Sequence, residues 1–317
     1  MMNFWKELRK PLFVQAPMED VTDTVFRQML LKTGRPDVFF TEFTNVDGMF
    51  SAGRELVMQR LQFGKEETPI VAQIWGSKPE NFYNAAKYIK EQGFDGVDLN
   101  MGCPQKDVIK KGLCAALIEN RDLAAKIIKA TQDGADGLPV SVKTRIGIKE
   151  ISTEDWIGFL LGFDLAALII HGRTVKEMSA VPAHWDEIGK AVELRARSFK
   201  DTVLIGNGDV MSREDGIEKI KTHGVDGVMI GRGILENPWV FNVEEKVRAK
   251  EERVATYAEH VRLHSETWGA TKHFDRLKKY MKMYIRGFAG SSELRAQIVE
   301  CSDTETLLSL LEKGTVL

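Results

Sequence analysis

Short apolar runs alternate with longer amphipathic stretches along most of the chain. Eight runs have the length and composition of strands buried in a parallel sheet, at residues 13–14, 38–40, 70–72, 96–99, 140–142, 168–170, 203–205 and 228–230. Stretches compatible with helices lie between them, at residues 80–92, 122–131, 184–197 and 213–222. Because strand and helix alternate throughout, the pattern predicts an α/β fold, a (β/α)8 TIM barrel.

Three joints that lead into predicted strands share the order glycine, apolar residue, aspartate. They are Gly93-Phe94-Asp95, Gly162-Phe163-Asp164 and Gly224-Val225-Asp226. Glycine can adopt the left-handed conformation that ends a helix, after which the chain turns into the next strand. The shared joint indicates one βα unit used repeatedly.

The strand pattern stops near residue 240, and the remaining chain is charged and helical in character, with helices predicted at residues 244–264 and 272–286. A TIM barrel takes about 250 residues, so the 317 residues of this chain suit one barrel and an appendage. We therefore expect a barrel domain over residues 1–240 and an all-helical domain over residues 241–317.

The composition, 43% hydrophobic and 28% charged, is that of a soluble globular protein and excludes disordered and fibrous classes. The N-terminus lacks the apolar stretch of a signal peptide, and no segment approaches the roughly 20 apolar residues of a membrane span. We expect a cytoplasmic monomer. The three cysteines, Cys103, Cys114 and Cys301, include no Cys-x-x-Cys pair, so neither a disulfide scaffold nor a metal site is expected.

The formal net charge of -2 does not favour a nucleic-acid partner, so such a partner requires a local basic patch. Residues 272–286 supply one, with Asp275 as the single acidic residue and with aromatic residues interleaved. The basic residues are Lys272, Arg276, Lys278, Lys279, Lys282 and Arg286, and the aromatic ones are Phe274, Tyr280 and Tyr284. Taken alone, the pattern favours a solvated helix face with core aromatics.

Polar residues follow almost every predicted strand. Since the active site of a TIM barrel lies at the carboxyl ends of its strands, these residues predict one site at that mouth. They are Met18, Glu42, Gln73, Asn100, Lys143 with Arg145, His171 with Arg173, Asn207 with Asp209, and Gly231 with Arg232.

The loops after the last two strands are rich in glycine, at Gly206-Asn207-Gly208-Asp209 and Gly231-Arg232-Gly233. Glycines allow backbone amides to approach an anion, and a helix N-terminus and an arginine favour it further. Because barrels commonly bind phosphate at this position, we expect a phosphorylated cofactor or substrate.

Lys143 and His171 end two neighbouring strands, and Gln73 ends an earlier one. A flavin gains negative charge on its ring when it is reduced, so lysine and imidazole donors beside it favour the reduced state. Lys143 is also a candidate for Schiff-base chemistry, and His171 for a hydrogen-bonded core residue.

One thiol stands in a glycine turn directly after a strand, in Asp98-Leu99-Asn100-Met101-Gly102-Cys103-Pro104. An unperturbed thiol has a pKa of about 8.5 and stays mostly protonated near neutrality, which suits Cys103 to a general acid. The alternative is a small buried side chain, which is our interpretation of Cys301 and Cys114.

The chain resembles the tRNA-dihydrouridine synthases in an ordered set of motifs across about residues 12–240. Besides the Cys103 segment, these are Ala16-Pro17-Met18-Glu19-Asp20-Val21-Thr22-Asp23, Val142-Lys143-Thr144-Arg145-Ile146-Gly147, His171-Gly172-Arg173-Thr174, Gly206-Asn207-Gly208-Asp209 and Met229-Ile230-Gly231-Arg232-Gly233. The stretch Arg276-Leu277-Lys278-Lys279-Tyr280 is similar to the helical domain of that family.

The resemblance implies a flavoprotein oxidoreductase whose barrel holds FMN. It implies Pro17 and Met18 beneath the flavin, with Gln73, Lys143 and His171 along its ring. The residues implied around the ribityl phosphate are Asn207, Gly208, Asp209, Gly231 and Arg232.

The resemblance also implies the reaction, in which NADPH reduces the flavin and a hydride then passes to carbon 6 of a uracil in tRNA. It assigns to Cys103 the protonation of carbon 5 from the opposite face, and to Asn100 the binding of the uracil edge. The residues implied along the approach of the RNA are Arg145, Arg173 and Thr174.

A base in folded tRNA must swing out before it can stack on a flavin, which requires a grip on the backbone nearby. With the resemblance, residues 272–286 are better explained as this grip, with Lys278 and Lys279 as tRNA-binding residues and the aromatics reading shape. Two rivals remain: an FMN barrel dehydrogenase of small molecules, which needs no basic helix, and a tRNA-binding module without chemistry, which would be colourless.

The chain departs from the family pattern at two places. Cys114 stands where the family has glycine, serine or alanine, which puts a second thiol near the site. Residues 178–182 lack the usual aromatic and glycine pattern, so tRNA contacts through this loop are not implied. Replacement of Cys114 or Cys301 is expected to do little.

Overall fold

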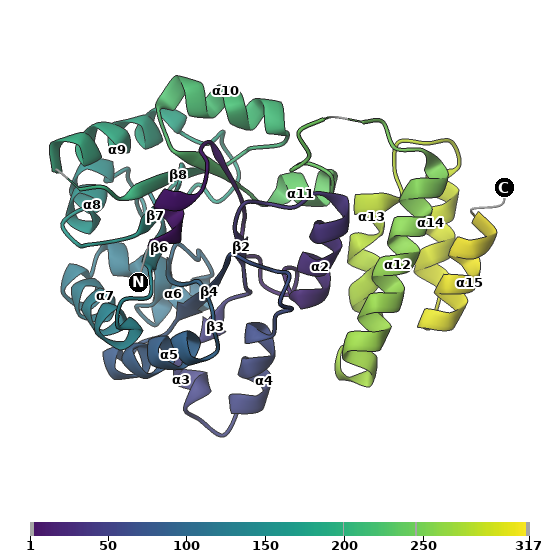
Figure 1. Ribbon diagram of the computed structural model, residues 1–317, viewed down its shortest axis with the longest axis horizontal. Coiled ribbons are helices and arrows are strands. Elements are labelled where there is room, and N and C mark those ends of the chain that lie inside the picture. The colour runs from purple at the N-terminus through teal and green to yellow at the C-terminus, as the bar shows by residue number, and fades with distance from the viewer. Residues whose placement is uncertain (1–2, 199, 245, 315–317) are drawn as a thin grey trace. The chain divides into compact units, whose positions relative to one another are not determined.

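The structure is a computed structural model that describes residues 3–198, 200–244 and 246–314 (Figure 1). Its parallel strands follow the path β1-β9-β8-β7-β6-β5-β4-β2. Their bounds are β1 Leu12–Gln15, β2 Phe39–Phe40, β4 Ile70–Trp75, β5 Gly96–Met101, β6 Val140–Arg145, β7 Ala167–His171, β8 Val203–Asn207 and β9 Gly227–Ile230. All eight predicted strands are therefore confirmed, and a short β3 (Thr44–Asn45) adds a further pairing to β4.

The two ends of this path meet, so the sheet is a nearly closed barrel. A parallel bridge joins Val14 to Val38, just before β2. Gln15 strengthens the closure, because its backbone N–H donates to Val38 O over 3.1 Å and its side-chain oxygen accepts from Phe40 N over 2.9 Å. Since closure leaves no free edge, the strands can be short and apolar on both faces.

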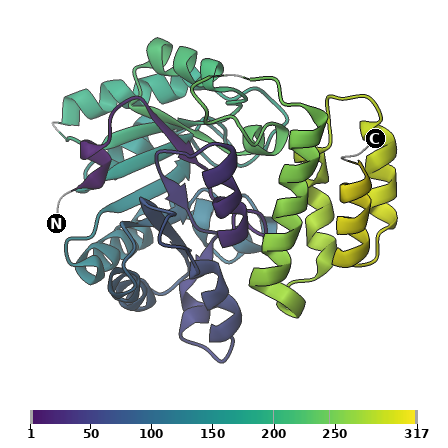
Figure 2. The ribbon, with the colours of Figure 1, turned by 45° about the vertical axis from the view of Figure 1, so that its right-hand side comes forward.

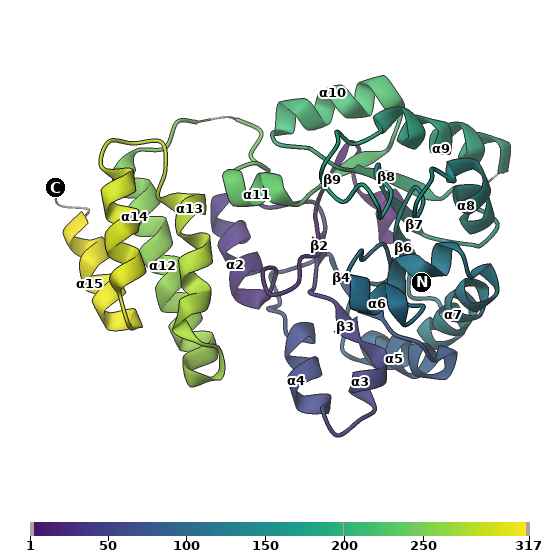
Figure 3. The ribbon, with the colours of Figure 1, turned by 180° about the vertical axis from the view of Figure 1, so that it is seen from behind.

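Helices surround this sheet on the outside (Figure 3). The four predicted helices are confirmed to within a few residues as α5 (Pro79–Glu91), α7 (Arg121–Ala135), α9 (Trp185–Ser198) and α10 (Arg213–His223). The remaining elements before Arg232 are α1 (Phe4–Glu7), α2 (Thr24–Thr33), α3 (Val46–Met49), α4 (Arg54–Met58), α6 (Lys106–Lys110), α8 (Thr153–Leu160) and the 3₁₀ helices η1 (Gln59–Leu61) and η2 (Cys114–Ile118).

A cluster of buried apolar side chains joins residues of several barrel strands, and Trp5 of α1 belongs to it. The Trp5 ring lies 6.2 Å from the Phe40 ring and packs with apolar residues of β1, β7, β8 and β9. Burial of large apolar side chains is worth about 2 kcal/mol each. The short N-terminal helix is therefore part of the barrel core.

The predicted glycine–aspartate joints form at the amino ends of the strands. Gly93 and Gly224 adopt positive φ values of 84° and 72°, whereas Gly162 ends its helix without one. Asp95 then accepts a hydrogen bond from Ile70 N over 2.7 Å, and Asp226 accepts one from Leu204 N over 2.8 Å. In both cases the aspartate before one strand holds the backbone of the preceding strand, which explains its recurrence.

The chain divides into two compact units that are not simple sequential halves. The second unit comprises Val25–Arg35, Met211–Arg213 and the region from Arg232 onward, and the barrel strands belong to the first. The helical domain expected from the sequence, residues 241–317, includes neither of these early segments. A local pattern does not reveal which distant segments pack together.

The second unit is helical, as the green-to-yellow ribbon of Figure 2 shows for its C-terminal region. After α11 (Arg232–Glu236) come α12 (Lys250–Trp268), η3 (Gly269–Thr271), η4 (Phe274–Tyr280), α13 (Met281–Tyr284), α14 (Ser291–Glu300) and α15 (Thr304–Gly314). The helix predicted at residues 244–264 therefore begins later, at Lys250. No helix in the described part of the chain is long and apolar enough to cross a membrane.

The predicted single helix over residues 272–286 is wrong, because η4 and α13 replace it. Tyr280 and Tyr284 are buried, at 4% and 0% exposure, and the ring of Tyr284 stacks on Tyr257 at 5.5 Å. Tyr284 Oη and His260 Nδ1 also form a hydrogen bond of 3.0 Å. These tyrosines form the core of the helical unit and do not offer rings to a ligand.

We expect Asp226→Asn to destabilise the barrel by about 1–3 kcal/mol at neutral pH, the cost of a disrupted charged hydrogen-bond cluster. Burial raises the pKa of Asp226, but bonds from Lys10 and Leu204 N and the nearby Arg195 outweigh burial and lower it. The stabilisation is thus present above the unfolded pKa of about 4 and is lost as the pH falls.

Urea unfolding of both proteins from pH 3 to pH 8 measures this difference. The matched control is Asp201→Asn, because Asp201 pairs with Lys6 at the surface and its side chain is 88% exposed. That change should alter the free energy of unfolding by less than about 1 kcal/mol. A loss in Asp226→Asn that is the same at every pH would contradict the assignment.

Candidate active site

The carboxyl ends of the strands bring the predicted site residues together. In the strand register Asn100 stands beside Lys143, Arg145 beside His171, and His171 beside Asn207. These residues come from β5 to β8, four neighbouring strands. The prediction that the strand ends converge on one mouth is confirmed for them.

A chain of buried hydrogen bonds supports the segment that carries Cys103. Ser141 Oγ and Gln73 Nε2 donate to the Asp98 carboxylate over 2.6 and 2.8 Å. Gln73 Oε1 accepts from Asn100 Nδ2 over 3.0 Å. Asn100 Oδ1 in turn accepts from the backbone N–H of Cys103 over 3.0 Å, so the turn after β5 is fixed from below.

This chain changes the role expected for Gln73. Its side chain is fully buried and both ends of its amide bind protein groups, which argues against contact with a flavin ring. Asn100 keeps a second amide N–H, since its Nδ2 has one partner and its Oδ1 accepts from Gly102 N and Cys103 N. Asn100 can therefore act on a ligand only as a donor.

Two buried groups of opposite charge lie under the mouth. Burial raises the pKa of Asp98 to about 7, although bonds from Ser141 and Gln73 and the charge of Lys143 oppose the rise. Burial lowers the pKa of Lys143 to about 8, and the charge of Arg145 adds to the effect. The ammonium of Lys143 is thus poorly compensated, and an added negative charge beside it would be stabilised.

Lys143 also reaches the loop expected to hold a phosphate. Its Nζ donates to Asn207 Oδ1 over 3.1 Å, and Asn207 Nδ2 donates to Met229 O over 2.8 Å. In the same loop Gly208 has a φ of 129°, and a Cβ there would lie 2.7 Å from the Cβ of Ala183. Only glycine fits this position.

Met18 and Gly231 lie together at the end of the barrel closure. A Cβ added to Gly231 would meet the Cβ of Ala16 at 3.4 Å and the Sδ of Met18 at 3.8 Å. Pro17 is buried between Ala16 and Met18, and Met18 is partly exposed. Arg232 is exposed and begins α11, which belongs to the second unit.

Arg173 and Thr174 support loops from inside, and their place along the approach of RNA stays a prediction. They are 2% and 1% exposed. The guanidinium of Arg173 pairs with Asp209 and donates to Val181 O over 2.6 Å, which ties down the unusual loop at residues 178–182. Asp209 is therefore held by the protein and is a weak candidate for direct contact with a phosphate.

Arg145 joins two loops at the mouth. It is 7% exposed and donates to Gly102 O over 2.9 Å and to Thr174 O over 3.1 Å. Gly102 directly precedes Cys103, so the positive charge of Arg145 lies near the thiol. Its burial indicates an electrostatic and structural role more than direct contact with RNA.

Cys103 lines a cavity of about 190 Å³. The other lining residues are Glu19, Phe43, Asn45, Val57, Arg60, Trp75, Gln105, Val108 and Cys114. Two aromatic rings, an acid–base pair and two thiols thus surround a space suited to one flat heterocycle. Phe43, Trp75 and Arg60 were not expected as site residues; Trp75 ends β4, but Arg60 follows two short helices that no motif connects to the mouth.

The two thiols of this cavity are hydrogen-bonded to each other, which changes the protonation expected for Cys103. The bond from Cys114 lowers the pKa of Cys103 to about 7; burial opposes this, while Gln105 N and the charge of Arg145 assist it. The same bond and burial raise the pKa of Cys114 well above its usual value. With a pKa of about 7, Cys103 is divided between thiol and thiolate near neutrality, and its role as a proton donor stays a prediction.

The carboxylates near the cavity hold its loops. Glu19 pairs with Arg60, whose Nε donates to it over 2.8 Å. Glu19, Asp20 and Glu42 lie within 4.8 Å of one another, and Glu42 accepts from Asp20 N over 2.7 Å. These contacts connect the loop after β1 with the loop after β2, and they place negative charge on one side of the thiol.

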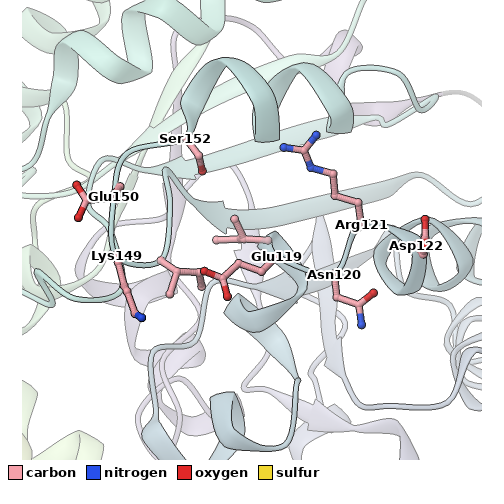
Figure 4. Close-up of a pocket in the computed structure, with 9 residues that line it drawn as sticks. Glu119, Asn120, Arg121, Asp122, Lys149, Glu150 and Ser152 are labelled. Atoms are coloured by element: carbon pink, nitrogen blue, oxygen red, sulfur yellow. The ribbon is translucent and has the colours of Figure 1, made fainter.

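A second, larger cleft of about 690 Å³ lies between the start of α7 and the loop after β6 (Figure 4). The charged residues in its wall are Glu119, Arg121, Asp122, Lys149 and Glu150. The three acids outnumber the two bases, so the cleft does not favour a polyanion. The cleft also contains no thiol or imidazole among its lining residues, so reactive chemistry concentrates at Cys103.

The basic residues of 272–286 differ in their exposure to solvent. Lys278 donates to Val299 O over 2.9 Å and pairs with Asp275 over 3.0 Å. Arg276, Lys279 and Lys282 are exposed on the helical unit. We call these three residues the basic patch.

Comparison with known proteins identifies the family. The family model described as "Dihydrouridine synthase (Dus)" matches residues 14–316. "Probable tRNA-dihydrouridine synthase 2" of Bacillus subtilis (strain 168) is 45% identical over 313 residues, covering 98% of this chain and 96% of the relative. "Probable tRNA-dihydrouridine synthase" of Staphylococcus aureus (strain COL) is 45% identical over 314 residues, covering 98% and 95%.

Among solved structures, morphinone reductase is similar with a TM-score of 0.50 and 14% identity, covering 72% of this chain and 84% of the other. This likeness concerns the barrel fold alone. The family model and the relatives each span nearly the whole sequence. The chain therefore belongs to the dihydrouridine synthase family.

Proposed function

We propose that this protein reduces specific uridines of tRNA to dihydrouridine, with FMN as its cofactor and NADPH as its reductant. The observation that carries the proposal is Cys103, a thiol in the wall of a small cavity at the barrel mouth that Phe43 and Trp75 also line. The relatives named as probable tRNA-dihydrouridine synthases support the choice of substrate.

The residues of the mouth fit FMN. Its ring bears a polar edge and gains negative charge on reduction, and Lys143 is a partly buried amine whose pKa burial lowers to about 8, although the charges of Asp98 and Cys103 oppose this. Asn207, Gly208 and Gly231 form the loops where barrels hold a phosphate. We propose Lys143 and His171 as ring contacts, Pro17 and Met18 as the surface beneath the ring, and Arg232 as a phosphate contact.

The chemistry supplied by bound FMN is the hydride that saturates the uracil double bond at carbon 6. The residues of the chain supply the proton and the contacts to the base. Cys103 donates its proton to carbon 5, and the second amide N–H of Asn100 donates to a uracil carbonyl. Phe43, Trp75 and Val57 make the cavity apolar around the ring, which excludes water and strengthens these bonds.

The basic patch is proposed to bind the backbone of the tRNA. Arg276, Lys279 and Lys282 are exposed, whereas nearby tyrosines are buried, so the patch offers charge without aromatic stacking. Charge of this kind binds phosphate without reading sequence. Lys278 adds positive charge beside the patch, although its amine already has protein partners.

Cys103→Ala should retain flavin absorbance and NADPH oxidation by oxygen but lose dihydrouridine formation by about 10²–10⁴-fold, the usual contribution of a general acid. Cys301→Ala is the matched control, because Cys301 lies in the helical unit and its thiol donates to Gln297 O. Dihydrouridine is measured by mass spectrometry of digested tRNA. Unchanged formation of dihydrouridine by Cys103→Ala would show that Cys103 is not the proton donor.

The rate of uridine reduction should fall as the pH rises through about 7, because the general acid loses its proton there. In Cys114→Ala the bond to the Cys103 sulfur is absent, so the pKa of Cys103 should rise and the alkaline decline should move to higher pH. Alkylation of Cys103 by iodoacetamide, followed against pH, measures the same pKa without turnover. A profile identical in both proteins would show that the thiols do not interact.

Arg276, Lys279 and Lys282, changed together to glutamate, should raise KM for tRNA by at least about 10-fold, leave kcat nearly unchanged and weaken the dependence of binding on salt. A triple change of Lys87, Lys126 and Lys129, exposed on α5 and α7, alters the net charge equally and should have little effect. Undiminished turnover of tRNA in the first variant would favour a small-molecule substrate.

A further inference from the structure

Two thiols share the small cavity at the barrel mouth. Cys103 and Cys114 both line it, and each thiol shifts the pKa of the other. They come from segments on either side of α6, the turn after β5 and the start of η2. Any polar side chain could form a hydrogen bond with Cys103. A second thiol can in addition form a disulfide with it, and the proposed reduction of uridine does not use this chemistry.

The backbone at Cys114 supports a specific role for this side chain. Cys114 has a φ of 52°, in the left-handed region that favours glycine, and it is 2% exposed. A residue other than glycine in this conformation is under backbone strain. The chain thus holds a thiol at a position where glycine would be less strained, and directs it at Cys103.

The two thiols differ in access and in reactivity. Cys103 is partly exposed, whereas Cys114 is buried and lines the same cavity. Arg145 and Gln105 N stabilise a negative charge on Cys103, and burial disfavours one on Cys114. An oxidant that enters the cavity therefore meets a nucleophilic thiolate first and a second thiol behind it.

We infer that Cys103 and Cys114 form a peroxide-sensitive modification site, in which oxidation joins the two sulfurs in a disulfide. The Cys103 thiolate attacks one oxygen of hydrogen peroxide, the O–O bond breaks, and the products are a sulfenic acid and, after protonation, water. The Cys114 sulfur then attacks the Cys103 sulfur, the S–O bond breaks, and a second water leaves. Two thiols and one peroxide thus give one disulfide and two waters.

The disulfide would stop Cys103 from acting as the proposed proton donor and would protect its sulfur from further oxidation. Cys103 in a disulfide has no proton to give, so turnover stops until a thiol reductant restores both cysteines. Without Cys114 the sulfenic acid remains open to further peroxide and to irreversible sulfinic acid. The effect on turnover rests on the proposed function of Cys103, whereas formation of the disulfide does not.

The purified full-length protein, treated with hydrogen peroxide and then with an alkylating agent, should yield a peptide pair linked through Cys103 and Cys114 that dithiothreitol separates. Peptide mass spectrometry detects this link whether or not the protein acts on uridine. Dihydrouridine formation, assayed in parallel, should fall as the link appears and return to at least about 80% of its initial value after reduction.

Cys114→Ser should give no linked peptide, and its Cys103 should be trapped by dimedone and pass to sulfinic acid that dithiothreitol does not reverse. Cys114→Ala provides the same test if the serine variant folds poorly. Cys301→Ser should link as the wild type does. Oxidation of wild-type Cys103 to sulfinic acid without a link, a link to Cys301 instead, or equal recovery of the wild type and Cys114→Ser would overturn the inference.

Discussion

Each barrel strand runs parallel to its neighbours, and the hydrogen-bond register fixes which residues stand side by side at the carboxyl ends. Asn100 lies beside Lys143, and His171 beside Asn207, only because β5 to β8 are paired in this register. A shift by one residue would turn these side chains to the opposite face and bury apolar groups in the mouth. The chemistry of the protein therefore depends on the closure and register of one sheet, which the aspartates at Asp95 and Asp226 secure from the other end.

The site is built with support beneath the groups that meet a ligand. Asp98 holds Gln73, Gln73 holds Asn100, and Asn100 holds the backbone of Cys103, so the reactive thiol is placed by a buried polar chain and not by its own loop. Such a chain is stable only when every member has its partners, because an unpaired polar group in this environment is costly. Burial also affects the charges at the mouth, because it lowers the pKa of Lys143. The positive charge of Arg145, which lies near the thiol, lowers the pKa of Cys103.

The local patterns of the sequence predicted the strands well and the later helices less well. Buried parallel strands are continuous apolar runs, a signal that does not depend on distant residues, and all eight were found where expected. The stretch around Tyr280 and Tyr284 was misread because charged residues alternate there with aromatics that belong to a core. Only the packing of Tyr257 and His260 against them reveals which side of the segment is inside.

The sequence by itself determined the barrel and the set of polar residues at its mouth, since these follow from apolar periodicity and from ordered motifs. The tertiary structure decided how these residues are used. It turned Gln73, Arg173 and Thr174 inward, and it brought Cys114 against Cys103. The physical reason is that burial, hydrogen-bond partners and pKa depend on neighbours that are close in space but far apart in the chain, and no local pattern records them.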